Sequence, residues 1–141
     1  MIRLLIIALV FASMQMSCEQ SKECCVYPEL ADLNGTWELK KLTNGFAQID
    51  QVGEEIGFTQ RLEISAEKST FERYTNNELE LSSTLKKEVV FDQNALVLPD
   101  EEVYMFYSFE LVDGVYHLRL YQESPIGAVL ADGSDYYYLK R

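Results

Sequence analysis

The chain has 141 residues, with 12 basic and 23 acidic side chains and a formal net charge of −11. This length suits one domain, and the acidic balance argues against DNA or RNA as a partner, because phosphate backbones attract clusters of Lys and Arg. The cysteines are Cys18, Cys24 and Cys25, so neither a disulfide framework nor a cysteine zinc cage is expected from Val26 onward.

The first segment is typical of a secretory signal. Arg3 precedes an almost unbroken apolar run from Leu4 to Met14, and the small residue Ser17 stands just before Cys18. The run is shorter than the ~20 apolar residues that a membrane-spanning helix needs. With a cysteine directly after it, the segment resembles the lipobox of bacterial lipoproteins. That resemblance implies cleavage after Ser17 and acylation of Cys18 by chains such as palmitate.

This layout divides the chain into a signal peptide over residues 1–17, a lipidated tether over 18–28 and one domain over 29–141. The alternative is an ordinary secreted protein cut near Ser17. Under the lipoprotein interpretation the membrane partner is reached through the lipid on Cys18. Because Glu19 is not the Asp that marks inner-membrane retention in the enteric scheme, we expect an outer-membrane lipoprotein of the bacterial envelope. The adjacent Cys24 and Cys25 could pair together, pair with another chain or stay free.

Beyond the tether, apolar and polar residues alternate between turn signals, which predicts strands. The predicted strands are Thr36–Thr43, Phe58–Ser65, Thr70–Thr75, Leu79–Leu85, Glu88–Phe91, Ala95–Leu98, Val103–Val112, Val115–Gln122 and Tyr136–Arg141. Short helices are expected only within Pro28–Leu33 and parts of Ile49–Ile56. Many short antiparallel strands must close or stack to remove their edges. We therefore predict an all-β fold, a small antiparallel up-and-down barrel of about eight strands, with a β-sandwich as the alternative.

Asp113-Gly114 between two alternating runs predicts a two-residue hairpin turn, since both positions must accept a positive φ. This turn fixes the register of the two strands. One face would carry the cross-strand pairs Leu111 with Tyr116, Phe109 with Leu118, and Tyr107 with Leu120, all pointing into the barrel. The other face would carry Glu110 with His117 and Ser108 with Arg119, so His117 is expected outside.

The segment Leu33-Asn34-Gly35-Thr36-Trp37-Glu38-Leu39 resembles the Gly-x-Trp opening strand of the lipocalins, and more closely that of small lipocalin-like lipoproteins of the Bacteroidetes type. Those proteins also end on an aromatic-basic strand, here Tyr136–Arg141. The resemblance implies that Trp37 plugs the closed end of the barrel, with Leu39 also inside. It also implies that Lys140 or Arg141 packs over the Trp37 ring, a contact that a cation and an aromatic face favour.

The sequence offers no constellation for catalysis. His117 is the single histidine, and the acidic cluster Asp100-Glu101-Glu102 lacks the spacing of a calcium loop. We therefore expect no enzyme activity, no metal and no cofactor. Aromatic side chains predicted inside, such as Tyr107, Phe109 and Tyr116, suit a barrel that holds a small apolar or amphipathic ligand. The alternative is a filled barrel that acts as an interaction or inhibitor protein of an envelope assembly.

Overall fold

The structure is a computed structural model that describes residues 30–128 and 133–141. The predicted signal over 1–17, the acylated Cys18 and the tether over 18–28 lie outside the described residues. The described elements, in chain order, are α2 (Leu30–Leu33), β1 (Gly35–Asn44), β2 (Ile49–Val52), η1 (Gly53–Ile56), β3 (Gln60–Ser65), β4 (Thr70–Thr75), β5 (Glu78–Thr84), β6 (Lys86–Val90), β7 (Gln93–Leu98), η2 (Pro99–Glu101), β8 (Val103–Val112), β9 (Val115–Pro125) and β10 (Asp135–Lys140).

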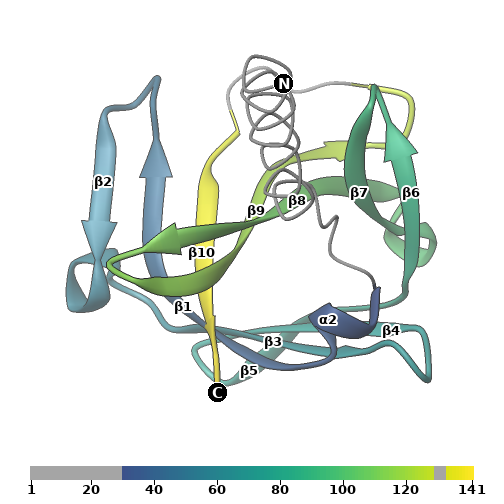
Figure 1. Cartoon of the computed structure of the whole chain (residues 1–141), viewed down its shortest axis with the longest axis horizontal. Coiled ribbons are helices and arrows are strands. Elements are labelled where there is room, and N and C mark those ends of the chain that lie inside the picture. The colour runs from purple at the N-terminus through teal and green to yellow at the C-terminus, as the bar shows by residue number, and fades with distance from the viewer. Residues whose placement is uncertain (1–29, 129–132) are drawn as a thin grey trace, which may run out of the picture.

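The prediction of an all-β fold is confirmed. One antiparallel sheet, in the order β5-β4-β3-β1-β10-β9-β8-β7-β6, curls into a half-barrel (Figure 1). Its edge strands β5 and β6 are consecutive in the chain and are separated by Leu85 alone, so the backbone itself links the two edges. Leu85 is buried. A curled sheet of this kind buries one face of every strand against the others, which accounts for the alternating pattern in the sequence.

Strand β1 changes partners along its length, and this shapes the outer surface. On one edge it pairs with β10 from Trp37 to Thr43. On the other edge it pairs with β3 over Gly35–Glu38 and then with β2 over Lys41–Asn44. The β1–β10 ladder shifts register between Leu39 and Lys41. Such a bulge bends and twists a strand, which lets β1 leave β3 and join β2.

Among the described strands, β2 is the one that the sequence did not predict. A short helix was expected in parts of Ile49–Ile56, and the structure has the strand Ile49–Val52 followed by the 3-10 helix Gly53–Ile56. Gly53 and Gly57 both take a positive φ, so they begin and end that turn. The two short elements share one stretch of sequence, and neither is long enough to show a helical or strand period.

The β8–β9 hairpin has the predicted register. Asp113 and Gly114 have φ values of 50° and 79°, as a two-residue turn of this kind requires. The observed cross-strand pairs include Tyr107 with Leu120, Phe109 with Leu118, Leu111 with Tyr116, and Glu110 with His117. A second register shift lies near Met105, between Tyr104 and Phe106.

Candidate functional site

The concave face of the curled sheet is filled by large side chains. The main core cluster joins strands from both halves of the sheet, and its members are Leu33, Trp37, Leu62, Ile64, Phe71, Leu81, Leu85, Leu96, Leu98, Met105, Tyr107, Leu118, Leu120 and Tyr138. Leu39, Val103, Phe109 and Tyr136 pack against it. Of the predicted interior residues, Trp37, Tyr107, Leu118 and Leu120 thus lie within the core, and Leu39 and Phe109 lie at its border. The interior is a packed core at the places where a ligand was expected.

Two predicted interior residues are not inside. Leu111 is 62% exposed and Tyr116 is 69% exposed, although they pair with each other as predicted. The reason is the reach of the neighbouring strands: β10 pairs with β9 only as far as Leu118, and β7 pairs with β8 only as far as Phe106. Beyond these points, within the described part of the chain, the hairpin is a two-stranded ribbon to which no third strand is paired.

His117 also differs from expectation, because its side chain is only 9% exposed. Its register partner is Glu110, so it lies on the face opposite Leu118, as predicted, but that face is covered at this position. Its Nδ1 lies 3.0 Å from the carbonyl oxygen of Val115. One ring nitrogen of His117 is therefore paired with the backbone of its own strand, and this contact gives the side chain a structural role.

Trp37 lies at one end of the core with a basic side chain above it. The ring is 3% exposed, and its Nε1 donates a 2.7 Å hydrogen bond to the carbonyl oxygen of Leu33. Of the two basic candidates, Lys140 places its Nζ 5.4 Å from the ring centroid. Gly35 has a φ of +131°, and a Cβ there would stand 2.9 Å from the Cε of Lys140. The glycine of the Gly-x-Trp motif therefore leaves room for the lysine that covers the tryptophan.

A chain of polar side chains links β10 to β9 through β3, β4 and β5. Arg73, whose side chain is 14% exposed, donates to Glu123 at 2.6 and 3.3 Å and to Glu80 at 3.3 Å. Burial lowers the pKa of Arg73, but the hydrogen bond to Glu123 and the charges of both carboxylates outweigh it and leave the pKa raised. The remaining links are Thr75 to Glu80, Gln60 to Thr75 and Tyr138 to Gln60.

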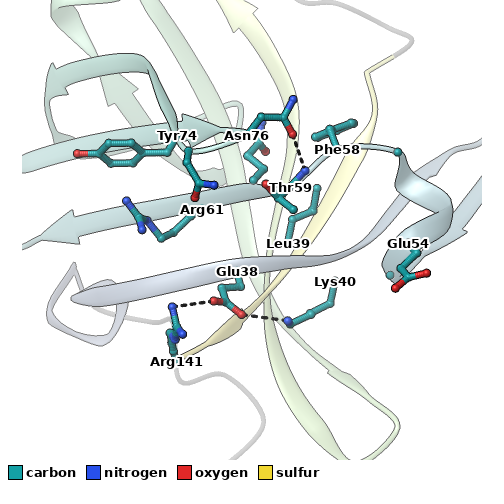
Figure 2. Close-up of a pocket in the computed structure, with 14 residues that line it drawn as sticks. Glu38, Leu39, Lys40, Glu54, Phe58, Thr59, Arg61, Tyr74, Asn76 and Arg141 are labelled. Atoms are coloured by element: carbon teal, nitrogen blue, oxygen red, sulfur yellow. Dashed lines mark hydrogen bonds and ion pairs between the residues drawn. The ribbon is translucent and has the colours of Figure 1, made fainter.

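Outside the packed core, a cleft of about 650 Å³ opens where β1 leaves β3 (Figure 2). One wall is β1 with the chain terminus, another is the turn η1, and the third is the β3–β4 hairpin. The lining residues are Glu38, Leu39, Lys40, Gly53, Glu54, Gly57, Phe58, Thr59, Gln60, Arg61, Tyr74, Asn76, Asn77 and Arg141. A concave site of this volume is large enough for a small molecule.

Glu38 holds two cations at the rim of the cleft. Its Oε2 accepts from Lys40 Nζ at 3.0 Å, and its Oε1 lies 3.1 Å from Arg141 Nη1, as the dashed lines in Figure 2 show. The hydrogen bond from Lys40, with the charges of Lys40, Arg141 and Arg61, lowers the pKa of Glu38. Glu38 is therefore a carboxylate at neutral pH, and it draws the cations toward one place.

Arg61 forms the floor of the cleft beside Glu38, its direct cross-strand partner. Its guanidinium carbon lies 4.5 Å from the centroid of the Tyr74 ring, and its Nη2 lies 3.1 Å from Glu63 Oε1. Its Nε is buried and has no hydrogen-bond partner among the described residues. The stacked ring fixes the plane of the guanidinium, so its N–H groups keep a fixed direction.

The remaining wall is held by backbone contacts. Asn76 Oδ1 accepts from the Thr59 amide at 3.0 Å, and the Asn76 amide donates to the Thr59 carbonyl oxygen at 2.8 Å. Asn76 and Asn77 have φ values of 52° and 68° and form the turn between β4 and β5. These bonds tie the segment before β3 to that turn, so the cleft has a fixed edge opposite η1.

Sequence reasoning did not find this cleft. The outward positions of Arg61 and Tyr74 follow from alternation with Leu62 and Phe71, but alternation does not show which strand lies alongside. The cleft exists because β1 pairs with β2 as well as β3. The Asn76-Asn77 dipeptide was the one local signal in this region, since both residues accept a positive φ.

No protein-family model, curated protein or solved structure matches this chain. Within residues 30–128 and 133–141, no group of three or more His, Cys, Asp or Glu side chains is placed to hold a metal ion. In the same residues, no helix is long and apolar enough to cross a membrane.

Proposed function

We propose that this protein is a non-enzymatic binding module, tethered to the bacterial envelope through Cys18, whose ligand occupies the outer cleft and not the interior. The observation that carries the proposal is the cleft of about 650 Å³ at the divergence of β1 and β3. Its walls mix aromatic, amide and charged side chains, so they offer both apolar contact and hydrogen-bonding groups to a small molecule.

The packing of the interior supports this location. Fourteen residues of the core cluster fill the concave face, and several of them, such as Phe71, Met105 and Leu118, are almost completely buried. Protein interiors packed in this way leave few voids larger than a water molecule. A ligand placed there would have to displace core side chains, whereas the cleft accepts one without such a cost.

Blocking the cleft tests the proposal. Thr59 is exposed and lines the cleft, and its hydrogen bonds to Asn76 are made by its backbone amide and carbonyl groups. Thr59→Trp should fill the space and abolish a co-purifying ligand seen by native mass spectrometry of the extracted full chain. Thr84→Trp, at an exposed threonine outside the cleft, serves as the matched control and should leave the ligand in place. Equal ligand occupancy in the two variants would remove the cleft from consideration.

The anchor is tested separately. The signal layout around Cys18 predicts that Cys18→Ser leaves a precursor that is uncleaved or soluble, while the parent chain enters the detergent phase. Intact mass measurement of the parent chain should show acyl chains on the new N-terminal cysteine. A Cys18→Ser chain that still partitions into detergent after signal removal would contradict the lipoprotein interpretation.

A second candidate is a protein-interaction module, which the exposed hairpin tip favours. Leu111, Val115 and Tyr116 are large side chains exposed together at the end of the β8–β9 ribbon. Apolar groups gathered on a projecting element are typical of protein contacts. Under this alternative, Leu111→Ser with Tyr116→Ser would abolish association with a membrane partner in crosslinking, whereas Thr59→Trp would leave it unchanged.

A further inference from the structure

The charge of the cleft differs from the charge of the chain. The whole sequence has 12 basic and 23 acidic residues. The lining of the cleft, by contrast, has the cations Lys40, Arg61 and Arg141 against the carboxylates Glu38 and Glu54. Glu63, outside the lining, contacts Arg61. With Glu63 counted, three cations meet three carboxylates, so the cleft is close to neutral on a strongly acidic chain and repels an anion less than the rest of the surface does.

The donors in the cleft exceed the acceptors that they meet. Glu38 is shared between Lys40 and Arg141, so one carboxylate serves two cations. Arg61 has five N–H donors, of which the structure shows a contact to Glu63 through Nη2 while its Nε is buried without a partner among the described residues. A buried N–H group left in this state is costly, so the hydrogen bonding of Arg61 is incomplete among the described residues.

The geometry of Arg61 favours a planar or tetrahedral anion. The Tyr74 ring lies against one face of the guanidinium at 4.5 Å, which leaves its edge for hydrogen bonding. Carboxylates and phosphates accept two parallel bonds from such an edge. Because Glu38 and Arg61 are direct cross-strand partners, Arg141 on Glu38 lies on the same side of the sheet as Arg61. In Figure 2, Glu38 lies between Lys40 and Arg141, and Arg61 is drawn above the β1 ribbon beside Tyr74.

The cleft also has an apolar part. Leu39 and Phe58 line it between the cationic rim and the turn η1, as Figure 2 shows. A ligand with a charged head and a short apolar body would therefore match both regions. The volume of about 650 Å³ suits a body of modest size rather than a long acyl chain.

We propose that the cleft binds a small amphipathic molecule with an anionic head, a carboxylate or a phosphate, held by Arg61 and Arg141, with its apolar part against Leu39 and Phe58. This assignment rests on the proposed function and names its ligand class. Lys40 and Glu38 set the local field, and Glu38 competes with the ligand for the same cations.

The test uses the full chain in dodecyl maltoside and isothermal titration calorimetry, with a micelle-only blank. The probes are octanoate, octyl phosphate and octan-1-ol, which share one apolar chain and differ in the head. Both anions should bind at least tenfold more tightly than the alcohol, and their affinity should fall as NaCl is raised. The ratio of octanoate to octyl phosphate affinity tells a free carboxylic acid from a phosphate-bearing ligand such as a lipid headgroup.

Substitutions of the charged side chains test where the anionic head of the ligand binds. Arg61→Gln and Arg141→Gln should each weaken the anions at least tenfold and leave the alcohol unchanged. Arg141 is 70% exposed at its side chain, so its substitution does not endanger folding. Arg61→Lys keeps the charge and should lose part of the affinity, since an ammonium cannot make paired bonds. Glu38→Gln should tighten the anions by removing the competing carboxylate. Lys68→Gln, at an exposed lysine outside the cleft, is the charge-matched control and should have no effect.

Two results would overturn the assignment, and only the second would also rule out the proposed function. If octan-1-ol binds as tightly as the anions and Thr59→Trp abolishes it, the cleft remains a ligand site but the anionic head is wrong. If no probe binds, or binding persists in Thr59→Trp, both the ligand class and the proposed function fail.

Discussion

The concave interior and the outer cleft share the strands β1 and β3, yet they have different characters. In β1 and β3, Trp37, Leu62 and Ile64 face the core, Glu38 and Arg61 face the cleft, and Leu39 contacts both. The interior gains its stability from apolar burial, and the cleft carries charges that the fold does not need. Alternation along a strand therefore lets one pair of strands serve stability on one face and binding on the other.

The largest expected effect lies on the interior side. Trp37→Ala should lower the free energy of unfolding by about 3–5 kcal/mol, since it removes a buried ring and its hydrogen bond to Leu33. Tyr116→Ala, at an exposed aromatic residue, should change the stability by less than about 0.5 kcal/mol. Chemical denaturation followed by circular dichroism measures both. Equal losses would mean that the interior and the hairpin tip do not differ in packing.

The interior should also set an alkaline limit to stability. Burial raises the pKa of Tyr138 above its ordinary value. The neutral phenol is then favoured in the folded state, so its contribution is intact below about pH 10 and is lost as the pH rises further, because the unfolded phenol ionises. Each pH unit above that value should cost about 1.4 kcal/mol through this residue alone. The free energy of unfolding should fall less steeply with pH in Tyr138→Phe than in the parent chain. Parallel curves of stability against pH for the two chains would contradict this role of Tyr138.

A smaller effect is expected at the polar chain between the two regions. Glu123→Gln leaves Arg73, 14% exposed at its side chain, with a weaker acceptor, and should cost about 1–3 kcal/mol. Replacing both Arg73 and Glu123 by Met should cost less than twice the loss of stability in Glu123→Gln, since no unpaired charge remains. Thermal denaturation of the two variants checks the order. If Glu123→Gln left the thermal stability unchanged, Glu80 alone would satisfy the hydrogen bonding of Arg73.

The smallest expected effect on stability lies in the cleft. Arg141→Gln removes one exposed partner of Glu38 and should change the free energy of unfolding by less than about 0.5 kcal/mol. Denaturant midpoints for this variant and the parent chain should coincide. A loss above about 1 kcal/mol would mean that the cleft charges hold the fold together, and the contrast between the two regions would disappear.

Most strands followed from the sequence because they alternate in polarity and end at turns. Asp113-Gly114 fixed the register of β8 and β9, since few residue pairs accept positive φ twice. Burial was less predictable: Leu111 and Tyr116 share the face of Phe109, but exposure depends on how far the adjacent strands extend. The alternation of polar and apolar residues in one strand does not show how far the adjacent strand extends.

The cleft and the polar chain were beyond sequence reasoning for a different reason. Both depend on residues brought together from distant segments, such as Arg73 with Glu123 and Glu38 with Arg141. The strand β2 was not predicted from the sequence, so the departure of β1 from β3 had no sequence counterpart. Charged residues in a strand indicate which face points outward. Whether a cleft forms on that face depends on the path of the backbone.

The central claim is that ligands enter the cleft and leave the interior packed. Amide and methyl chemical-shift mapping of the isotope-labelled full chain with octanoate tests it most directly. The account predicts shifts at Leu39, Lys40, Phe58 and Arg61, which line the cleft, with the methyl groups of Leu96, Met105 and Leu118 in the core unchanged. Shifts centred on the core methyl groups, with the cleft amides unchanged, would contradict it.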